Sequence, residues 1–496
     1  MSEKIDVLLI NPGEQQRIFQ NLTQDFVSVE PPVFAGLFAM YLQEKDTSVA
    51  IIDQPAMRWT ATEVAAVALY DYEPTLIVLV VYGAQPSAST QNMTAAENIA
   101  SKIKEDSNIP IMMTGTHPAA LPEQTLHNES IDFVCDREGP VTILKTLRAL
   151  QLKSDTFYTV PSLWWKYDNV VVSPNISAPL ITDLDYEMPG IAWDLLPMDK
   201  YRSHNWHSFG HIEKRQPYAA IHTSLGCPFS CHFCCINAPF GRPGYRMWSA
   251  ENVIQEIDYL AEEYGVVNIK FVDEMFVLNP KHVLEICDLL GKRPYAVNIW
   301  AYARVDTVKD KFLEALKSAG VNWLCLGIES ASKHVRDGAD KKYGNEEIID
   351  VVRRIQAAGI YVIGNFIFGL PDDTPERMKE TFDLATELNC EYANFYSAMA
   401  YPGSPLYQQA ITEGRELPDK WEDYSQHGYG TKPLANEYCT SAEILEIRDR
   451  AHTDYFTHKP YLDMVKQKFG QEVVDHIGQM VKIPLRRKLL EEGKGK

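Results

Sequence analysis

The sequence predicts an α/β protein: a doubly wound parallel β-sheet, then a partial (β/α)6 barrel, then a helical C-terminal region. Residues 1–150 alternate short apolar runs with segments of helical periodicity, and residues 216–400 repeat that alternation six times. Strands that alternate with helices are typical of parallel sheets, because each helix carries the chain back to the next strand. Residues 151–215 have recurring prolines and weak periodicity and are expected to form a linker, and residues 401–496 are expected to be largely helical.

The composition indicates a globular protein with more than one core. The 496 residues exceed the length of one ordinary domain, and 45% of them are hydrophobic. A formal net charge of −20 weighs against a nucleic-acid substrate, because phosphate backbones are bound by basic surfaces. The one basic stretch, at 482–488, is expected to be a solvated helix end.

Nothing in the sequence indicates export or insertion into a membrane. The first residues lack the basic and long apolar segments of a signal peptide, and the longest apolar run, at 75–82, is too short to cross a bilayer. Nine cysteines, an odd number, favour a reducing compartment. We therefore expect a cytoplasmic protein without membrane contact.

The first unit is predicted from five apolar runs and the helical stripes between them. The run at 75–81 is continuously apolar, as in a strand that is buried on both faces of a parallel sheet. The fingerprint G-x-G-x-x-G is absent after the first strand, so neither a nicotinamide nor a flavin cofactor is expected. Strands are predicted at 5–10, 49–53, 75–81, 109–114 and 131–135, and helices at 32–42, 62–70, 93–105 and 140–150.

The second unit is predicted from six strand–helix repeats, which form an open barrel. Ser249 is a plausible N-cap for the helix after the first strand, and Thr374 followed by Pro375 begins a later one. Barrel chemistry lies at the carboxyl ends of the strands. The strands are predicted at 219–223, 267–272, 297–303, 323–327, 361–368 and 392–398.

Three cysteines follow the first barrel strand in the spacing C-x3-C-x2-C: Cys227, Cys231 and Cys234. Thiolates bind soft metals, and three of them on one loop can hold three irons of an iron–sulfur cube and leave the fourth iron open. The alternative is a zinc loop with Cys235 or His232 as the fourth ligand. Zinc loops usually pair two C-x2-C halves, however, and the remaining cysteines are scattered singly (Cys135, Cys287, Cys325, Cys390, Cys439).

This loop, with an aromatic residue, Phe233, before its last cysteine, resembles the cluster loop of the radical S-adenosylmethionine (radical SAM) superfamily. The resemblance implies a 4Fe-4S cluster held by Cys227, Cys231 and Cys234. In that family the open iron chelates the amino and carboxylate groups of S-adenosylmethionine.

Later segments resemble the S-adenosylmethionine-binding segments of the superfamily in the same order. Asp273 and Glu274 follow the second strand and resemble the acidic turn that holds the methionine amino group. Glu329 and Ser330 end the fourth strand, where Glu329 would accept the ribose hydroxyls, because a buried carboxylate without a partner would be costly. Arg304 ends the third strand. Its partner would be the methionine carboxylate, a substrate acid or, in a structural salt bridge, an acidic residue of the protein.

The adenine is expected against the last two strands of the barrel. Gly364 would let it approach the backbone, Ile363 or Ile367 would cover a ring face, and main-chain groups near Ala398 would bind its edge. The C-terminal region is expected to close the open barrel and to shape a substrate pocket.

Placed before such a core, the first unit resembles the cobalamin-binding domain of cobalamin-dependent radical SAM enzymes. The resemblance rests on the order of the elements and on small-residue loops at the strand ends, which would suit a broad corrin; the alternative is a bare sheet without a ligand. The residues implied are Tyr82, Gln85, Ser87, Gly115, Thr116, His117, Glu138 and Gly139.

The cobalt environment is expected to lack a histidine beneath the ring. The mutase-type sequence Asp-x-His-x-x-Gly is missing, and His117 follows the fourth strand rather than the first, so no cobalt-ligand role is given to it. Tyr82 or Gln85, at the end of the third strand, is the candidate to lie beneath the corrin.

The resemblance implies a radical SAM enzyme that cleaves S-adenosylmethionine to a deoxyadenosyl radical and methylates an unactivated carbon, or phosphorus, of a small metabolite. Methylcobalamin would deliver the methyl group. A flavodoxin or ferredoxin would supply electrons. The alternatives are a cobalamin-dependent cyclase, rearrangement or oxidation enzyme and, from another class, a non-catalytic regulatory protein that binds cobalamin or metal.

Overall fold

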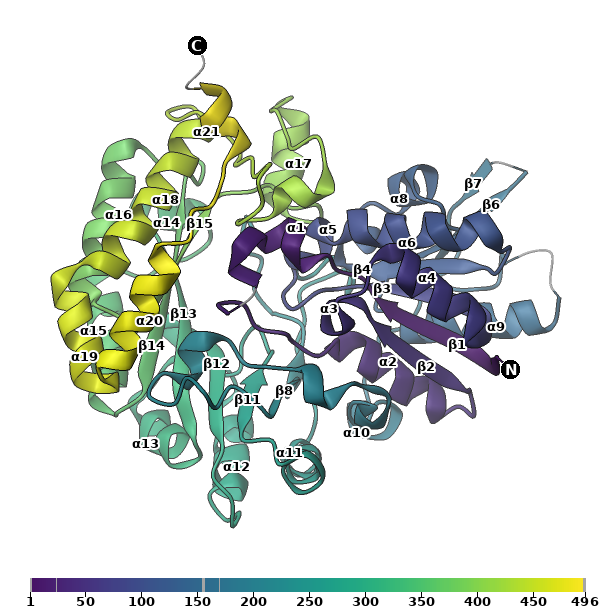
Figure 1. Ribbon diagram of the computed structural model, residues 1–496, viewed down its shortest axis with the longest axis horizontal. Coiled ribbons are helices and arrows are strands. Elements are labelled where there is room, and N and C mark those ends of the chain that lie inside the picture. The colour runs from purple at the N-terminus through teal and green to yellow at the C-terminus, as the bar shows by residue number, and fades with distance from the viewer. Residues whose placement is uncertain (1, 24, 154–156, 169, 494–496) are drawn as a thin grey trace.

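The computed structural model describes residues 2–23, 25–153, 157–168 and 170–493 of the chain (Figure 1). The N-terminal part contains a seven-stranded sheet in the order β2-β1-β3-β4-β5-β6-β7. Its first five strands are parallel, and the chain changes direction across the sheet between β1 and β3. The strands are β1 Glu3–Asn11, β2 Val49–Asp53, β3 Tyr72–Val81, β4 Ile111–Gly115, β5 Phe133–Cys135, β6 Leu163–Tyr167 and β7 Val170–Val172. In such sheets ligands bind at this change of direction, outside the carboxyl ends of the strands.

Helices cover both faces of this sheet, which confirms the predicted doubly wound arrangement. Val7 and Leu9 of β1 pack with α2 and α9, whereas Leu8 and Ile10 pack with α4 and α6 on the opposite face, as the alternation of a strand requires. The helices are α1 Gln15–Phe19, α2 Val33–Gln43, α3 Gln54–Met57, α4 Ala61–Tyr70, α5 Ala88–Gln91, α6 Met93–Asp106, α7 Thr116–Ala120, α8 Pro122–Asn128 and α9 Pro140–Gln151, with a 3-10 turn at Gln20–Thr23.

The segment predicted as a linker, 151–215, is only partly irregular. Its strands β6 and β7 pair antiparallel and extend the first sheet beyond β5, so the sheet does not end at residue 150. The rest of the segment runs between the two sheets and buries large side chains such as Trp193 and Tyr201. Its short helices are α10 Leu184–Glu187 and the 3-10 turns Trp193–Leu195, Met198–Lys200 and Asn205–Ser208.

The second sheet has six parallel strands in the order β15-β14-β13-β12-β11-β8, so β8 and β15 are its edges and the barrel is open, as predicted. Ser249 and Thr374 cap α11 and α16, each accepting a backbone N–H three residues on. The strands are β8 Tyr218–Ile221, β11 Asn268–Phe271, β12 Asn298–Arg304, β13 Val321–Glu329, β14 Tyr361–Phe368 and β15 Tyr392–Ser397, with a small hairpin of β9 Ser224–Leu225 and β10 Arg246–Met247. The helices are α11 Ala250–Tyr264, α12 Pro280–Leu290, α13 Asp310–Ser318, α14 Lys333–Gly338, α15 Asn345–Ala357 and α16 Pro375–Leu388, with a 3-10 turn at Val305–Thr307.

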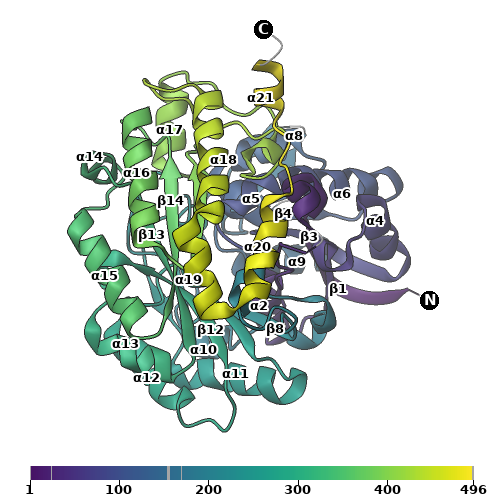
Figure 2. The same cartoon turned by 60° about the vertical axis from the view of Figure 1, so that its left-hand side comes forward.

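The C-terminal helices α18, α19 and α20 lie side by side against the barrel (Figure 2), and α18 lies beside the edge strand β15 (Figure 1). Helix α18 is joined to this edge by Tyr455, whose hydroxyl donates to the carbonyl of Cys390 at 2.7 Å. The helices are α17 Pro405–Thr412, α18 Ser441–Thr457, α19 Lys459–Phe469, α20 Gln471–Val481 and α21 Lys488–Gly493, with a 3-10 turn at Trp421–Tyr424. Among the residues described, no helix combines the length and apolar composition needed to cross a bilayer.

One apolar core runs through both units. It contains Leu37 and Phe38 from α2, Trp193 from the connecting segment, and Ile221 and Ile254 from the barrel. The carboxyl ends of the two sheets are therefore held against each other, which is where ligands of both folds bind.

Candidate functional site

The cysteine loop borders a cavity of about 310 Å³ between the carboxyl ends of the two sheets. Cys227, Cys231 and Cys234 line it on the barrel side, together with side chains at the ends of the barrel strands. The first turn of α2, with Phe34, and the loop after β3, with Gly83, line the opposite side.

Backbone hydrogen bonds hold the cysteine loop in place. The N–H of Gly244 donates to the carbonyl of Cys227 at 3.1 Å, and that of Cys234 to the carbonyl of Cys231 at 3.0 Å. Burial raises the pKa of the Cys227 thiol to about 11 and that of Cys234 well above its ordinary value. Metal binding here would therefore release thiol protons.

A single zinc ion and an iron–sulfur cluster require different arrangements of their ligands. In the described part of the chain, no three His, Cys, Asp or Glu side chains are placed to hold one metal ion together. A structural zinc ion needs four ligands converging on one point. Three thiolates that each bind a different iron of a cluster have no such requirement.

Arg304 joins the end of β12 to the cysteine loop. Its guanidinium lies 3.9 Å from the ring centroid of Phe229, and its Nη1 donates to the sulfur of Cys231 at 3.7 Å. It is also paired with Asp306 at 3.0 Å, so the structural salt bridge left open by the sequence is present. The cationic group nevertheless lines the cavity beside the thiols.

Of the two acidic residues after β11, only Glu274 faces the cavity. Asp273 is fully buried and accepts three hydrogen bonds, from the Thr223 N–H and hydroxyl at 2.6 Å each and from the Ser224 hydroxyl at 2.5 Å. Those bonds fix the turn, so the expected contact of Asp273 with a ligand is not supported. The buried Oε2 of Glu274 has no hydrogen-bond partner among the described residues, and burial raises its pKa to about 8.

Glu329 has a protein partner that the sequence argument missed. The Nζ of Lys341 lies 2.5 Å from its Oε1, and both side chains are buried. The reasoning that Glu329 needs a ligand as its partner is therefore wrong, although Glu329 and Lys341 both line the cavity. A bulge at the end of β13 turns Glu329 inward with a φ of 66°, and a side chain at Gly327 would stand 2.5 Å from its carboxylate.

The last two strands contribute Asn365, Ile367 and Ala398 to the cavity. Gly364 does not line the cavity, because successive residues of a strand face opposite sides and Gly364 shares the face of Phe366. A Cβ at Gly364 would meet the Phe366 ring at 2.8 Å. Ser330 also lies outside the cavity, where its hydroxyl is 3.2 Å from that of Thr381.

Tyr82, Gln85, Ser87 and Thr116 of the first unit line the cavity. Tyr82 is fixed in position because its ring stacks on Phe34 at 3.8 Å and its hydroxyl donates to the carbonyl of Glu138 at 2.8 Å.

Four other residues of the first unit that were expected to contact a cofactor line neither this cavity nor the larger one beside it. The ring of His117 is buried between Thr90, 3.2 Å from its Nδ1, and Trp421, whose ring packs edge-on at 4.4 Å. Glu138 is paired with Arg246 at 2.7 Å. The four residues that line neither cavity are Gly115, His117, Glu138 and Gly139.

The two glycines of that set have packing roles. A Cβ at Gly115 would stand 2.0 Å from the carbonyl oxygen of Val81, and one at Gly139 would stand 2.8 Å from the ring of Phe38. The absence of a side chain lets neighbouring elements approach, which explains both glycines without a ligand.

His222, directly after β8, is a cavity residue that sequence reasoning missed. It is 4% exposed, and neither ring nitrogen has a hydrogen-bond partner among the described residues. Burial lowers its pKa to about 3, so the ring is neutral and can both donate and accept. Its position at a barrel strand end was the available signal.

A second cavity of about 600 Å³ lies next to the first and shares part of its wall, including Glu30, Tyr302, Tyr396 and Gln426. It extends from the ends of β1 and β3 through the open side of the barrel to α18 and α20. Three tyrosines of the C-terminal region, Tyr424, Tyr429 and Tyr438, line neither cavity.

Comparison with known proteins identifies relatives of the barrel and of the whole chain. Residues 221–385 match the Radical SAM superfamily model. The chain is 31% identical over 459 residues to an uncharacterised methyltransferase of Pyrococcus horikoshii. The aligned residues are 92% of this chain and 93% of the relative.

Solved structures share the fold over most of the chain. The radical S-adenosylmethionine methyltransferase TsrM of Kitasatospora setae, with cobalamin and a [4Fe-4S] cluster bound, covers 92% of this chain and 89% of its own, with a TM-score of 0.65 and 17% identity. The cobalamin-dependent S-adenosylmethionine radical enzyme OxsB covers 97% of this chain and 72% of its own, with a TM-score of 0.71 and 17% identity. The chain therefore belongs to the radical SAM superfamily and has the fold of TsrM and OxsB.

Proposed function

We propose that this protein is a cobalamin-dependent radical SAM methyltransferase that acts on an unactivated carbon, or phosphorus, of a small molecule. One observation carries the proposal: a single cavity is bordered by three thiols, by a carboxyl group whose buried Oε2 has no partner among the described residues, and by the strand-end loops of the N-terminal sheet. The cavity thus has donors for a cluster and for S-adenosylmethionine on one side and a cofactor-type sheet edge on the other.

The donor set fits a 4Fe-4S cluster and S-adenosylmethionine. Cys227, Cys231 and Cys234 would hold the cluster, which supplies the electron that cleaves the sulfonium bond. Glu274 is positioned to accept the protons of the methionine ammonium group, because its buried Oε2 has no partner in the part of the chain that the structure describes. Arg304 places a cation beside the thiols, where it can pair with a carboxylate.

Two further groups in the cavity suit the nucleoside part of S-adenosylmethionine. Ile367 and Ala398 offer an apolar surface for the adenine. The Glu329–Lys341 pair presents an acceptor and a donor for the ribose hydroxyls, and its charges compensate each other while the site is empty of substrate.

The edge of the N-terminal sheet suits a corrin. Residues 83–87 form a loop of mostly small side chains between the two cavities, and the stacked pair of Tyr82 and Phe34 closes one side of it. Bound there, cobalamin would supply the methyl group. His117 lines neither cavity, which supports giving it no role as a cobalt ligand.

The test is an anaerobic assay of the protein reconstituted with iron, sulfide and hydroxocobalamin, with methyl-labelled S-adenosylmethionine and a reductant. We expect deoxyadenosine together with label on cobalamin. Cys227→Ala should lose the cluster absorbance and deoxyadenosine, whereas Cys287→Ala, a buried thiol outside the cavities, should keep both.

Two other outcomes would replace the proposal. Deoxyadenosine without any labelled methylcobalamin would favour the cyclase, rearrangement or oxidation alternative. An intact cluster that never cleaves S-adenosylmethionine would favour the regulatory protein.

A further inference from the structure

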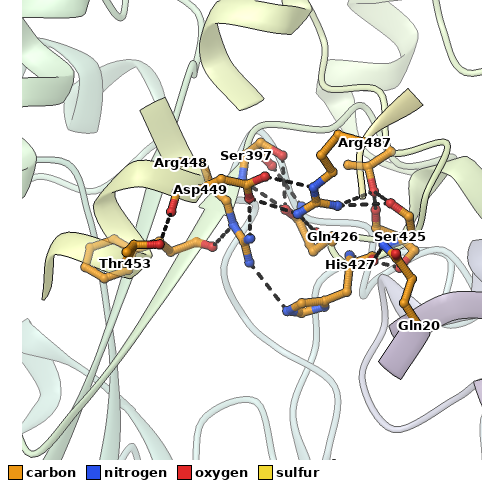
Figure 3. Close-up of polar contacts among 12 residues, drawn as sticks. Gln20, Ser397, Ser425, Gln426, His427, Arg448, Asp449, Thr453 and Arg487 are labelled. Carbon is orange, nitrogen blue, oxygen red and sulfur yellow. Dashed lines mark hydrogen bonds and ion pairs between the residues drawn. The ribbon is translucent and has the colours of Figure 1, made fainter. Parts of the chain in front are cut away.

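The larger cavity ends at a polar cluster, which contains Arg448, Asp449, Arg487 and His427 (Figure 3). We include His452, which also lines the cavity, in this cluster. Arg448, Asp449 and His452 lie on α18, and His427 lies in the loop that follows Tyr424. Four of the five line the cavity; Arg487 stands behind Asp449.

The cluster carries one excess positive charge. Asp449 is shared by two guanidinium groups, with Arg448 at 2.7 Å and Arg487 at 2.8 Å. Burial alone would raise the pKa of Asp449, but the two arginines hold it at about 2, so it is ionised. Burial keeps both histidines neutral, with the pKa of His452 lowered to about 3 and that of His427 well below its ordinary value.

The two arginines differ in how completely the protein satisfies them. All five N–H groups of Arg487 have acceptors: the Asp449 carboxylate twice, the carbonyls of Gly428 and Gln426, and the Thr431 hydroxyl. Arg487 is therefore structural.

Arg448 has donors to spare. It donates from Nε to the carbonyl of Phe395 at 2.7 Å, from Nη1 to Asp449 at 2.7 Å, and from Nη2 to His427 Nε2 at 3.4 Å. Each Nη carries two hydrogens, so two N–H groups of this cavity-lining residue have no acceptor among the described residues. Its side chain is only 4% exposed, so water outside the cavity does not satisfy them.

Part of the cavity wall is aromatic. Aromatic rings would pack against a flat or apolar part of a ligand, which the polar cluster alone would not bind. The aromatic residues from the barrel and the connecting segment are Trp206, Trp300, Tyr302, Tyr392 and Tyr396.

The polar cluster is connected to the cysteine cavity through β15. Arg448 bonds the carbonyl of Phe395, and the next residue, Tyr396, lines both cavities. A molecule anchored at Arg448 would therefore extend along Tyr396 toward the thiols.

We propose that Arg448 binds an anionic group of the substrate, a carboxylate or phosphate, while the aromatic wall holds its apolar body. This rests on the proposed function for the reaction, but not for the binding. A buried excess charge with free donors provides the local attraction that a chain with a net charge of −20 otherwise denies an anion.

The test is calorimetric titration of the anaerobically reconstituted protein with 2-naphthoate and with its neutral counterpart 2-naphthamide. We expect naphthoate to bind about tenfold more tightly or better, since one charge-assisted hydrogen bond is worth about 1.4 kcal/mol or more. Arg448→Gln should abolish this preference, and Arg448→Lys, which keeps the charge, should retain it. Arg486→Gln is the control, because Arg486 is 68% exposed and paired with Glu491.

Equal binding of the two probes by the wild type, or an unchanged preference in Arg448→Gln, would overturn the proposal. The phosphate of the cobalamin nucleotide is the other anion that could occupy the cluster. If Arg448→Gln weakens binding of hydroxocobalamin but not of cobinamide, which lacks the nucleotide, the substrate assignment is overturned in its favour. Failure of S-adenosylmethionine cleavage would leave the binding result standing, so the two proposals fail separately.

Discussion

A buried ion pair between the two units provides a sharp test of how the site is assembled. The Nζ of Lys270, in β11, lies 2.7 Å from the carboxylate of Glu30 and 3.1 Å from the carbonyl oxygen of Ala84. Glu30 and Ala84 belong to two loops that we assign to the cobalamin side of the site. The side chains are 3% and 14% exposed, and the ammonium group lies 5.0 Å from the ring centroid of Trp300.

Lys270→Met leaves the Glu30 carboxylate buried without its cation. Removing one partner of such a pair costs about 3–5 kcal/mol, and the partial exposure of Glu30 places the expected loss at about 3 kcal/mol. That loss corresponds to a more than hundredfold change in the unfolding equilibrium. In Lys270→Met/Glu30→Gln no charge is stranded, so we expect the double variant to lose only about 1 kcal/mol.

The assay is urea unfolding of the apoprotein under anaerobic conditions, followed by tryptophan fluorescence. Lys459→Met is the matched control, because Lys459 pairs with Asp463 at 2.5 Å but is 82% exposed, and it should leave the free energy of unfolding unchanged. A loss of unfolding free energy below about 1 kcal/mol in Lys270→Met would refute the reasoning. So would a double variant whose loss equals the sum of the losses in Lys270→Met and Glu30→Gln.

Three further predictions follow from the same contacts. Glu274→Gln should weaken S-adenosylmethionine binding about tenfold in equilibrium dialysis, because a charge-assisted hydrogen bond is lost, while Asp273→Asn should lower stability instead; the reverse pattern would contradict the assignment. His117→Ala should leave the EPR spectrum of bound Co(II) unchanged, and a nitrogen splitting that disappears in this variant would show the prediction to be wrong. Because the pKa of Asp449 is lowered from 3.8 to about 2, its stabilisation is present above pH 4 and is lost as the pH falls toward 2, by about 2 kcal/mol; acid titration of unfolding should show this loss, and Asp449→Asn should remove it.

The fold was predictable because both units use strands that are buried on both faces. The apolar runs at 75–81 and 361–368 have that property, and the structure places them in β3 and β14, each with a neighbouring strand on both sides. The hairpin of β6 and β7 escaped prediction since it lies among prolines and partly exposed residues, where periodicity is weak.

The site was only partly predictable, because neighbouring residues can face opposite ways. Asp273 and Glu274 are equivalent in sequence, yet one carboxylate fixes a turn and the other faces the cavity. Gly364 and Asn365 differ in the same way, which strand alternation decides only once the register is known.

The sequence by itself determined the two α/β units and the three thiols of one short loop, because periodicity and spacing are local properties of the chain. Only the tertiary structure decided which distant groups meet: Lys341 with Glu329, Lys270 with Glu30 across 240 positions, and Arg448 with the far end of the larger cavity. Such pairs depend on how the two sheets and the C-terminal helices pack, and that packing is set by the whole apolar core rather than by any local pattern.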